Sequence, residues 1–283
     1  MTDYRQRFAG IQRLYGTAPA ALLPRLHVCV IGLGGVGSWA VEALARSGVG
    51  QLTLIDFDVI KPGNTNRQLH TLNETLGRKK FAVLAGRVRS INPECRCHTI
   101  DDFLSERNVR DYLAPRRGYD YVIDAIDSIR FKAAMIHHCR RNKIPIITTG
   151  GAGGLTDPTA IKVADLSRTY NDPLAAKVRK RLRSGHRFPT NPKRYFGVDC
   201  VFSTQQPVYP RPDGGVSSAK PGIHGISLDC RYGYGSASFV TACFGFAAAS
   251  RVINKTLQKR ASEAGEATPF PAPPAELLSN TTD

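Results

Sequence analysis

A glycine-rich turn is the part of this sequence most suited to chemistry. The stretch GLGGVG lies between an apolar run and an amphipathic one, and its glycines are Gly32, Gly34, Gly35 and Gly37. Glycines at this spacing form a tight turn and let backbone N–H groups approach a phosphate at the N-terminus of the following helix. A nucleotide site is therefore predicted here.

Acids and cations behind the turn indicate which nucleotide it takes. Asp56 ends the next apolar run, where a ribose hydroxyl would bind, and Asp58 follows two residues later. Arg67, Lys79 and Lys80 come next along the chain. A helix N-terminus already handles the pyrophosphate of a dinucleotide, so the extra cations favour ATP, whose leaving pyrophosphate must be matched by positive charge. A nicotinamide-dependent dehydrogenase is the alternative.

A further strand-like run ends in two acids, Asp124 and Asp127. Ligands of open α/β sheets bind at the carboxyl ends of the strands, and two hard carboxylates there suit Mg²⁺. Each charged residue taken alone would be interpreted as a solvated surface residue. Their grouping around one crevice favours a site for ATP and Mg²⁺.

Strand-like and helical segments alternate and would position these residues. Apolar runs typical of buried parallel strands lie at 26–31, 51–55, 119–127 and 144–149. Helical periods lie at 36–46, 77–91, 104–114 and 129–143. The pattern predicts an α/β, Rossmann-like, doubly wound and mainly parallel sheet. Strand-like segments at 160–167 and 199–209 then predict a mixed or antiparallel C-terminal extension.

One domain is predicted over residues 1–257. Its nucleotide-binding half would be 20–155 and its substrate-facing half 156–257, closed by a helix at 236–258. Residues 258–283 are rich in Pro, Ala and polar residues, which predicts a disordered tail.

Charge and cysteine content restrict the partners and the compartment. The chain has 39 Lys and Arg against 23 Asp and Glu, a net charge of +16, which favours a polyanionic partner such as nucleic acid. Seven scattered cysteines argue against a disulfide scaffold and for the cytoplasm, and the absence of any CxxC pair argues against zinc. The apolar stretch 236–250 is too short for a comfortable membrane span and predicts a buried helix, with peripheral membrane contact left open.

The order of the motifs resembles that of the ubiquitin-activating-type adenylating enzymes. The shared motifs are GxGGxGS, LIDFD, NTNRQ, GRKK and VIDAID. The stretches RRNKIP, TTGGAGG, DPLAAKVRKRLR and GVDCVFST extend the resemblance, from Arg5 to about Lys255, to the bacterial tRNA threonylcarbamoyladenosine dehydratase family. This resemblance implies ATP-dependent adenylation of the threonyl carboxylate of a modified adenosine beside the tRNA anticodon, followed by ring closure that releases AMP.

The resemblance also implies roles for individual residues. Asp56 would hold the ribose, Asn64 and Arg67 would contact phosphates, Lys80 would neutralise the α- and β-phosphates, and Asp127 would hold Mg²⁺. The expected catalytic residues are Arg67, Lys80 and Asp127. The expected nucleotide-binding residues are Gly32, Gly34, Gly35, Gly37, Asp56, Asp58, Asn64, Arg67, Lys80 and Asp124.

A basic stretch at 177–194 is the predicted tRNA-binding surface, which would contact the phosphate backbone. Its candidate residues are Lys177, Arg179, Lys180, Arg181, Arg183, Arg187, Lys193 and Arg194. The alternative is a solvated helix. Cys200 and Cys230 each follow an aspartate in family-like motifs, and for both a packing role is favoured over a reactive thiol.

Two other functions remain as hypotheses. Adenylation of the C-terminal glycine of a ubiquitin-like sulfur carrier is the second, although the paired CxxC motifs of such activators are absent. A non-catalytic, nucleotide-gated RNA-binding module is the third.

The resemblance implies a homodimer in which an arginine reaches across to the other copy. Gly10 takes the expected position of that arginine, and Arg7 and Arg13 are the candidates. A monovalent cation (Na⁺ or K⁺) and a cysteine-desulfurase sulfur-transfer system are left open by the sequence.

Overall fold

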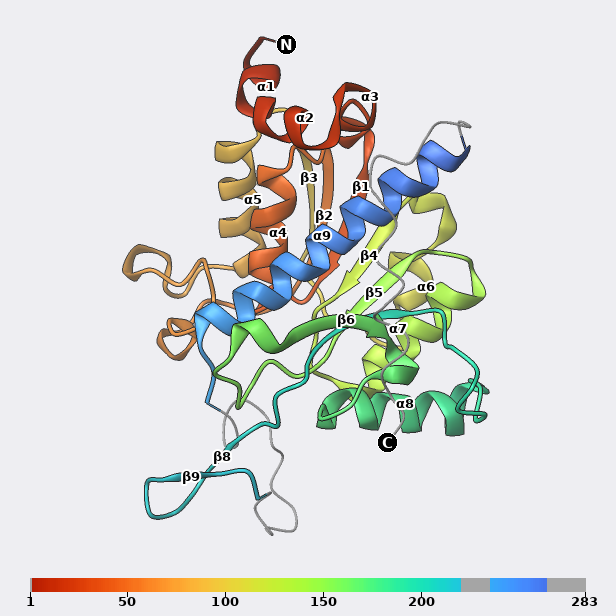
Figure 1. The fold of residues 1–283 in the computed structure, drawn as a ribbon. Helices are drawn as coiled ribbons and strands as arrows, with labels where there is room; N and C mark the ends of the chain where they lie inside the picture. The colour runs from red at the N-terminus through yellow and green to blue at the C-terminus, as the bar shows by residue number, and fades with distance from the viewer. Residues whose placement is uncertain (1, 220–234, 264–283) are drawn as a thin grey trace.

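A seven-stranded sheet forms the centre of the computed structural model, which describes residues 2–219 and 235–263 (Figure 1). Its strands are β1 (His27–Ile31), β2 (Gln51–Ile55), β3 (Arg96–Ile100), β4 (Tyr121–Asp124), β5 (Ile146–Thr149), β6 (Ile161–Asp165) and β7 (Asp199–Ser203). Their order is β3-β2-β1-β4-β5-β7-β6, and only the β6–β7 pair is antiparallel. The predicted α/β, mainly parallel sheet with an antiparallel C-terminal extension is confirmed.

The register of the central strands brings their carboxyl ends together. In the pairing of β1 with its neighbours, Ile31 lies opposite Ile55 of β2 and opposite Asp124 of β4. β1 is buried along its whole length, as its apolar sequence predicts for a central parallel strand. The segments that follow β1, β2 and β4 therefore meet at one edge of the sheet, which we call the carboxyl edge.

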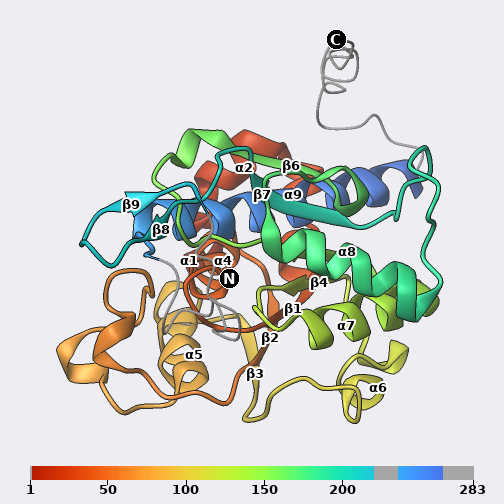
Figure 2. The same cartoon turned by 90° about the horizontal axis from the view of Figure 1, so that it is seen from below.

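Helices cover both faces of the sheet (Figures 1 and 2). On one face lie α4 (Gly37–Arg46), α5 (Lys80–Ile91) and α9 (Ser238–Glu263). On the other lie α6 (Val109–Tyr112), α7 (Ile129–Arg141) and α8 (Pro173–His186). Each face has its own buried apolar cluster, so the molecule is a three-layer sandwich with the carboxyl edge open at one end.

Helix α9 packs along α4 and differs at both ends from the predicted helix at 236–258. A Cβ atom on Gly245 would lie 2.6 Å from the carbonyl oxygen of Val36, so a side chain there would separate the two helices. The expected burial of 236–250 holds for much of the helix, for example at Val240 and Phe244. No helix in the described ranges is long and apolar enough to cross a membrane. Residues 258–263 are helical, where a disordered tail is predicted, and 264–283 lie outside the described residues.

Two other predicted elements are shorter than expected. Only Val109–Tyr112 of 104–114 is α-helical, because the Asn108 side chain accepts the N–H of Ser105 and forms a turn first. Strand β7 ends at Ser203, not at 209, because Gln205 turns aside and its Oε1 accepts two backbone N–H groups of the loop after β5. A two-stranded ribbon follows, β8 (Tyr209–Pro210) with β9 (Val216–Ser217).

The N-terminal helices lie at the end of the molecule opposite to the carboxyl edge (Figure 1). They are α1 (Thr2–Arg7), α2 (Ala9–Tyr15) and α3 (Thr17–Ala20). The Tyr4 hydroxyl donates to the carbonyl oxygen of Gly48 at 2.6 Å, just beyond the C-terminus of α4. The glycine turn precedes the other end of that helix, so the length of α4 separates the two regions.

Candidate active site

The glycine turn joins β1 to α4 and can be formed only with glycine at two positions. Gly32 has φ +84°, and a Cβ atom there would lie 2.8 Å from Ile126 Cγ2. A Cβ atom on Gly37 would lie 1.8 Å from the carbonyl oxygen of Gly32. No side chain caps α4 at Val36, although the N–H of Ser38 donates to the carbonyl oxygen of Gly34 at 3.1 Å. The N-terminus of the helix is therefore suited to bind an anion.

Gly34 and Gly35 form the middle of the turn and adjoin the loop after β2. The nearest atoms to their Cβ positions belong to side chains, those of Gln68 and Arg67 respectively. The turn and that loop therefore lie side by side at the carboxyl edge.

Asp56 links the end of β2 to the glycine turn. Its Oδ2 accepts the N–H of Leu33 at 2.6 Å and its Oδ1 accepts the N–H of Asp58 at 2.8 Å. Burial raises the pKa of the Asp56 carboxyl, against the opposing effects of Lys80 and the two N–H donors. Asp56 thus holds the turn in shape, which is a role beyond the ribose contact that the sequence indicates.

Lys80 opens α5 and forms an ion pair with Asp58. Its Nζ lies 2.9 Å from Asp58 Oδ2, and its backbone N–H donates to the carbonyl oxygen of Asp58. The Lys80 side chain is 6% exposed, whereas that of Asp58 is 43% exposed. Lys79 points elsewhere, because its Nζ contacts Phe57 O and Asp101 Oδ1. Only one of the two neighbouring lysines therefore belongs to the candidate site.

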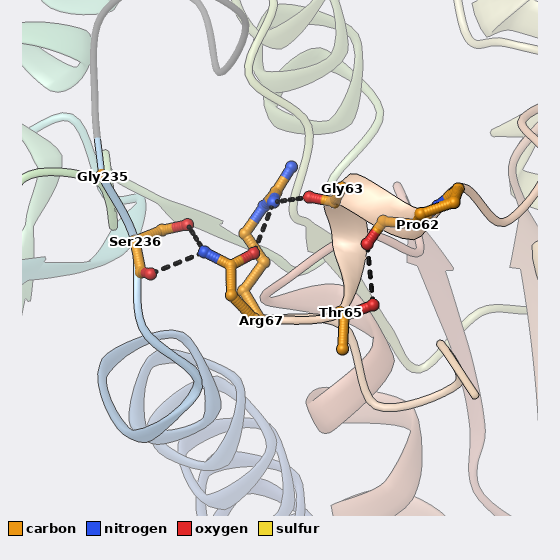
Figure 3. A pocket seen from close by; sticks show the side chains of 7 residues that line it. Pro62, Gly63, Thr65, Arg67, Gly235 and Ser236 are labelled. Carbon is orange, nitrogen blue, oxygen red and sulfur yellow. Dashed lines mark hydrogen bonds between the residues drawn. The ribbon is translucent and has the colours of Figure 1, made fainter. Parts of the chain in front are cut away.

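The loop after β2 carries Arg67 beside a pocket (Figure 3). Arg67 Nη1 donates to Gly63 O at 2.8 Å and to Asn66 Oδ1 at 2.9 Å. Asn66 Nδ2 in turn donates to Ser236 O at 2.8 Å, just before α9. The pocket has a volume of about 320 Å³ and is lined by Pro62, Gly63, Thr65, Asn66, Arg67, Gly235 and Ser236.

Asn64 has a structural role in the same loop. Its Oδ1 accepts the backbone N–H of Lys61 at 3.0 Å, which closes the short 3₁₀ turn Pro62–Asn64. Within residues 2–219 and 235–263 no hydrogen bond uses the side-chain amide N–H groups, which can therefore contact a phosphate. Asn64 therefore shapes the loop that carries Arg67.

The two acids that follow β4 occupy opposite environments. Asp124 is fully buried, with Lys132 Nζ 3.0 Å from its Oδ1 and the Thr148 hydroxyl donating to its Oδ2 at 2.6 Å. Asp127 is exposed, and no ion pair or hydrogen bond reaches its carboxylate within the described residues. The prediction that Asp124 binds the nucleotide is thus corrected, because its oxygens are occupied inside the protein.

The Asp124–Lys132 pair fixes the turn that carries Asp127. Lys132 Nζ also donates to the carbonyl oxygen of Ile126 at 2.8 Å, and Asp124 Oδ1 accepts the N–H of the same residue at 3.3 Å. Both peptide groups of Ile126 are therefore held by one buried ion pair. Lys132 is not among the predicted site residues. Its spacing from Met135, Ile136 and Cys139 nevertheless places it on the buried face of the helix, and a lysine there indicates a buried acidic partner.

Two further polar side chains adjoin the site although neither is among the predicted site residues: Gln68 lies beside Gly34, and His70 lies near Lys80. Gln68 and His70 are buried, and neither Gln68 Oε1 nor the two ring nitrogens of His70 have a partner in the described residues. Burial, assisted by the charge of Lys80, lowers the pKa of His70 to about 4, so its ring is neutral at pH 7. Their only sequence signal is their place directly after Arg67.

The basic stretch divides into exposed and half-buried residues. Arg179 donates to the Thr169 hydroxyl, and Arg183 stacks on Phe196 with its Cζ 5.4 Å from the ring centroid. These two half-buried arginines stabilise the packing of α8, which makes them weaker candidates for tRNA contact than the exposed residues. The exposed ones are Lys177, Lys180, Arg181, Arg187, Lys193 and Arg194.

The structure does not support a reactive thiol at Cys200. It lies in β7 with no exposed surface, and burial raises the pKa of its thiol well above the usual value. The favoured packing role therefore accounts for it. Cys230 lies outside the described residues.

The candidate arginines near the N-terminus are remote from the site of their own chain. Arg7 pairs with Asp3 on α1, and Arg13 lies on α2. Both helices are at the far end of α4 from the glycine turn. Neither arginine can reach the carboxyl edge of the same molecule.

Metal ligands do not cluster in the described ranges. No group of three or more His, Cys, Asp and Glu side chains converges there. A metal at the carboxyl edge would therefore depend on Asp127 together with oxygens from a ligand.

Comparisons with known proteins agree with this geometry. The family model described as "ThiF family" matches residues 11–273. The tRNA threonylcarbamoyladenosine dehydratase of Escherichia coli K12 is 53% identical over 261 residues, which are 92% of this chain and 97% of that protein. The enzyme of the same name from Haemophilus influenzae is 54% identical over 258 residues, 91% of this chain and 96% of that protein.

A solved structure of the E. coli enzyme, TcdA, holds ATP. It has a TM-score of 0.81 and 50% identity, and the match covers 92% of this chain and 97% of that one. A second structure of the enzyme, with AMP, has a TM-score of 0.80 and 51% identity, covering 91% and 96%. From these matches over nearly the whole length, the chain belongs to the ThiF family and, within it, to the tRNA threonylcarbamoyladenosine dehydratases.

Proposed function

We propose that this chain is an ATP-dependent tRNA threonylcarbamoyladenosine dehydratase, which converts the open threonylcarbamoyl group beside the anticodon to its cyclic form. The observation that carries the proposal is the half-exposed Lys80–Asp58 ion pair beside a helix N-terminus with no side-chain cap and an exposed Asp127. The relatives that match along nearly the whole chain support the same activity.

ATP would lie across the carboxyl edge. The N–H groups at the start of α4 suit a phosphate, and Asp56 is available to accept a ribose hydroxyl while it holds the turn. Lys80 could shift its ammonium group from Asp58 to a phosphate oxygen, since Asp58 has enough exposed surface to be solvated instead. The E. coli relative that holds ATP supports this nucleotide for the chain.

Adenylation is the first chemical step. An oxygen of the threonyl carboxylate attacks the α-phosphorus, the bond to the bridging oxygen breaks, and pyrophosphate leaves with the electron pair. Lys80 and Arg67 are the side chains suited to match the charge that develops on the phosphates. The pocket beside Arg67 is open enough to admit the substrate carboxylate.

Ring closure is the second step. The carbamoyl group attacks the activated carbonyl carbon and releases its N–H proton to solvent, while the bond between the carbonyl carbon and the phosphate oxygen breaks and AMP leaves with the electron pair. Because both reacting groups belong to the same nucleoside, a high effective molarity replaces an enzyme nucleophile. The burial of Cys200 is consistent with a reaction that needs no thiolate.

The exposed carboxylate of Asp127 fits Mg²⁺. It is a hard oxygen donor at the carboxyl end of β4, it has no partner in the described residues, and the Asp124–Lys132 pair fixes its turn. Bound there, the metal would supply charge compensation for the leaving pyrophosphate. Asp127 would orient it, with remaining ligands from phosphate and water.

The substrate would reach this edge as part of a whole tRNA. The exposed cations of α8 and the loop after it suit the phosphate backbone, and the net charge of +16 supports that contact. A homodimer, a monovalent cation, a cysteine-desulfurase partner and membrane contact through 236–250 stay predictions.

The test measures the products of the reaction. The protein is incubated with ATP, Mg²⁺ and tRNA that carries threonylcarbamoyladenosine, and AMP, pyrophosphate and the nucleosides are quantified by mass spectrometry. We expect one AMP for each cyclic nucleoside formed and none of either with unmodified tRNA. Cyclic product without AMP would contradict the mechanism, and AMP formed only with a ubiquitin-like sulfur carrier would assign a different substrate.

A further inference from the structure

The backbone of Arg67 is held by two helices that cover the same face of the sheet. Trp39 of α4 donates its Nε1–H to the carbonyl oxygen of Arg67 at 3.0 Å. The hydroxyl of Thr241, a buried residue of α9, donates to the same oxygen at 3.2 Å. Because both donors belong to helices packed on each other, the Arg67 backbone is fixed relative to the glycine turn at the start of α4.

The aliphatic part of the Arg67 side chain lies against the glycine turn. A Cβ atom on Gly35 would lie 3.2 Å from Arg67 Cγ and 3.4 Å from Arg67 Cδ, so a side chain at this position would push the arginine aside. This contact brings Arg67 beside the N-terminus of α4, where a phosphate is expected to bind.

One corner of the Arg67 guanidinium group is held by two acceptors. Arg67 Nη1 donates to the carbonyl oxygen of Gly63 at 2.8 Å and to Asn66 Oδ1 at 2.9 Å (Figure 3). Nη1 carries two hydrogens, so both are used. Among the described residues, no hydrogen bond or ion pair reaches Nε or Nη2 of Arg67. These two nitrogens form one edge of the planar group, and their parallel N–H bonds match two oxygens of a phosphate.

Asn66 is the side chain that joins this corner to α9. Its Nδ2 donates to the carbonyl oxygen of Ser236 at 2.8 Å and to Ser236 Oγ at 3.2 Å, two residues before the helix begins. The orientation of the amide follows from its partners, because the guanidinium of Arg67 can only donate and the carbonyl of Ser236 can only accept. Asn66 therefore uses both ends of its amide, although it is exposed.

We propose that Asn66 is a positioning residue for the adenylation step, which holds Arg67 with the Nε–Nη2 edge of its guanidinium toward the phosphates of ATP. The inference rests on the proposed function, in which Arg67 matches the charge that develops on the leaving pyrophosphate. An arginine that rotated freely would have to be ordered in each turnover, whereas a pre-oriented one is in place as the charge develops. Asn66 acts through Arg67 and does not touch the reacting atoms.

The test is a double-mutant cycle on kcat/KM for AMP release, measured with ATP, Mg²⁺ and tRNA that carries threonylcarbamoyladenosine. Asn66→Ala removes both contacts, and we expect about a tenfold fall, because a small misplacement of a group at the reacting centre is costly. Arg67→Lys keeps the positive charge but loses the planar edge that Asn66 orients. In the Arg67→Lys background, Asn66→Ala should cost less than about twofold, since the two residues act as a unit.

Asn142→Ala is the matched control. Asn142 is also an exposed asparagine whose Nδ2 donates to a backbone carbonyl, that of His138 at 2.8 Å. It follows the C-terminus of α7, whereas the N-terminus of that helix is the end near the carboxyl edge. This variant should keep the kcat/KM of the unaltered protein, and a tenfold fall here as well would contradict a specific role for Asn66.

Two results of the cycle overturn the proposal. An equal loss in both backgrounds would give Asn66 a merely structural role, and a gain of activity in Asn66→Ala would mean that Asn66 holds Arg67 in an unproductive position. Urea unfolding, followed by the fluorescence of the single tryptophan, checks that each variant is folded. If Asn66→Ala does not fold, Asn66→Ser repeats the cycle, because a serine side chain is too short to reach both partners.

The unaltered protein separates failure of this inference from failure of the proposed function. If it releases no AMP with modified tRNA, the proposed function and the role of Asn66 both fail. If it releases AMP normally while the two substitutions are additive, only the role of Asn66 fails.

Discussion

Two lysine–aspartate pairs lie at the carboxyl edge, and they differ in their access to water. Lys80 pairs with Asp58 at 2.9 Å, with side chains 6% and 43% exposed. Lys132 pairs with Asp124 at 3.0 Å, with side chains 1% and 0% exposed. Each lysine belongs to the first turn of a helix that follows a strand of the same sheet.

The difference indicates which pair can take part in chemistry. Water can solvate the Asp58 carboxylate when the Lys80 ammonium group moves to a phosphate, so this change of partner leaves no charge buried without a counterion. The Asp124 side chain has no exposed surface, so water cannot take the place of Lys132. Separating the pair would leave an unpaired charge inside the protein. The open pair therefore suits ligand binding, and the closed pair suits the positioning of Asp127.

Breaking the closed pair should have the largest effect on stability. Lys132→Met leaves Asp124 buried and uncompensated, so we expect the free energy of unfolding to fall by about 3–5 kcal/mol. Urea unfolding at pH 7 measures it. Lys132→Met/Asp124→Asn, which removes both charges, should recover part of the loss; a double variant as unstable as the single one would contradict the explanation.

Breaking the open pair should instead affect activity. Lys80→Met removes a charge matched to the phosphates, and we expect kcat/KM for AMP release to fall roughly 100- to 1000-fold. The free energy of unfolding should change by no more than about 1 kcal/mol, as for a pair with one exposed partner. Lys79→Met, with its exposed partner Asp101, is the control and should keep nearly full activity.

The pH dependence of stability should report on the surroundings of the Lys80–Asp58 pair through His70, which lies near Lys80. The folded ring has a pKa of about 4 against 6.5 when unfolded, so only the unfolded state takes up the proton between these values. Stability therefore falls as pH drops from 6.5 to 4, and His70→Leu should make this slope shallower by up to about 1.4 kcal/mol per pH unit.

Urea unfolding at pH 5 and pH 7 gives that slope. Burial also lowers the pKa of His27 to about 4, so His27→Phe should have a similar effect at the opposite end of β1. The two effects should add, because the sites are far apart. An unchanged slope in the His70 variant would rule out this source of acid sensitivity.

The smallest effect is expected on the surface of α8, where no pair is broken. Lys177→Gln/Lys180→Gln removes two exposed charges, and the slope of log Kd for tRNA against log salt should fall by about two, one for each phosphate contact. Arg89→Gln/Arg96→Gln removes the same charge from exposed positions on α5 and β3, away from α8, and should leave the slope unchanged. Binding at several salt concentrations provides the measurement.

Local spacing was sufficient to predict much of the site. The glycine turn, Asp56 and Lys80 each stand in a short motif that predicts a turn, a strand end or a helix start. The structure brings them together through contacts between Leu33 and Asp56 and between Asp58 and Lys80. The alternation of strands and helices likewise predicted the sheet, because βαβ units have few possible arrangements.

Packing of side chains between elements decided the rest. Asp124 and Asp127 stand in one motif, yet only the arrival of Lys132 from α7 and Thr148 from β5 buries the first. The partial burial of Arg179 and Arg183 was easier to predict. They are one helical turn apart, beside the apolar positions Val178 and Leu182.

The remoteness of the N-terminal helices has a consequence for enzymology. An arginine from α1 or α2 that assists the reaction must act in another molecule, since the length of α4 separates it from its own glycine turn. Specific activity would then depend on enzyme concentration and decline on dilution. Mixing a site-dead variant with an arginine-deficient one would regenerate one working centre from two inactive chains.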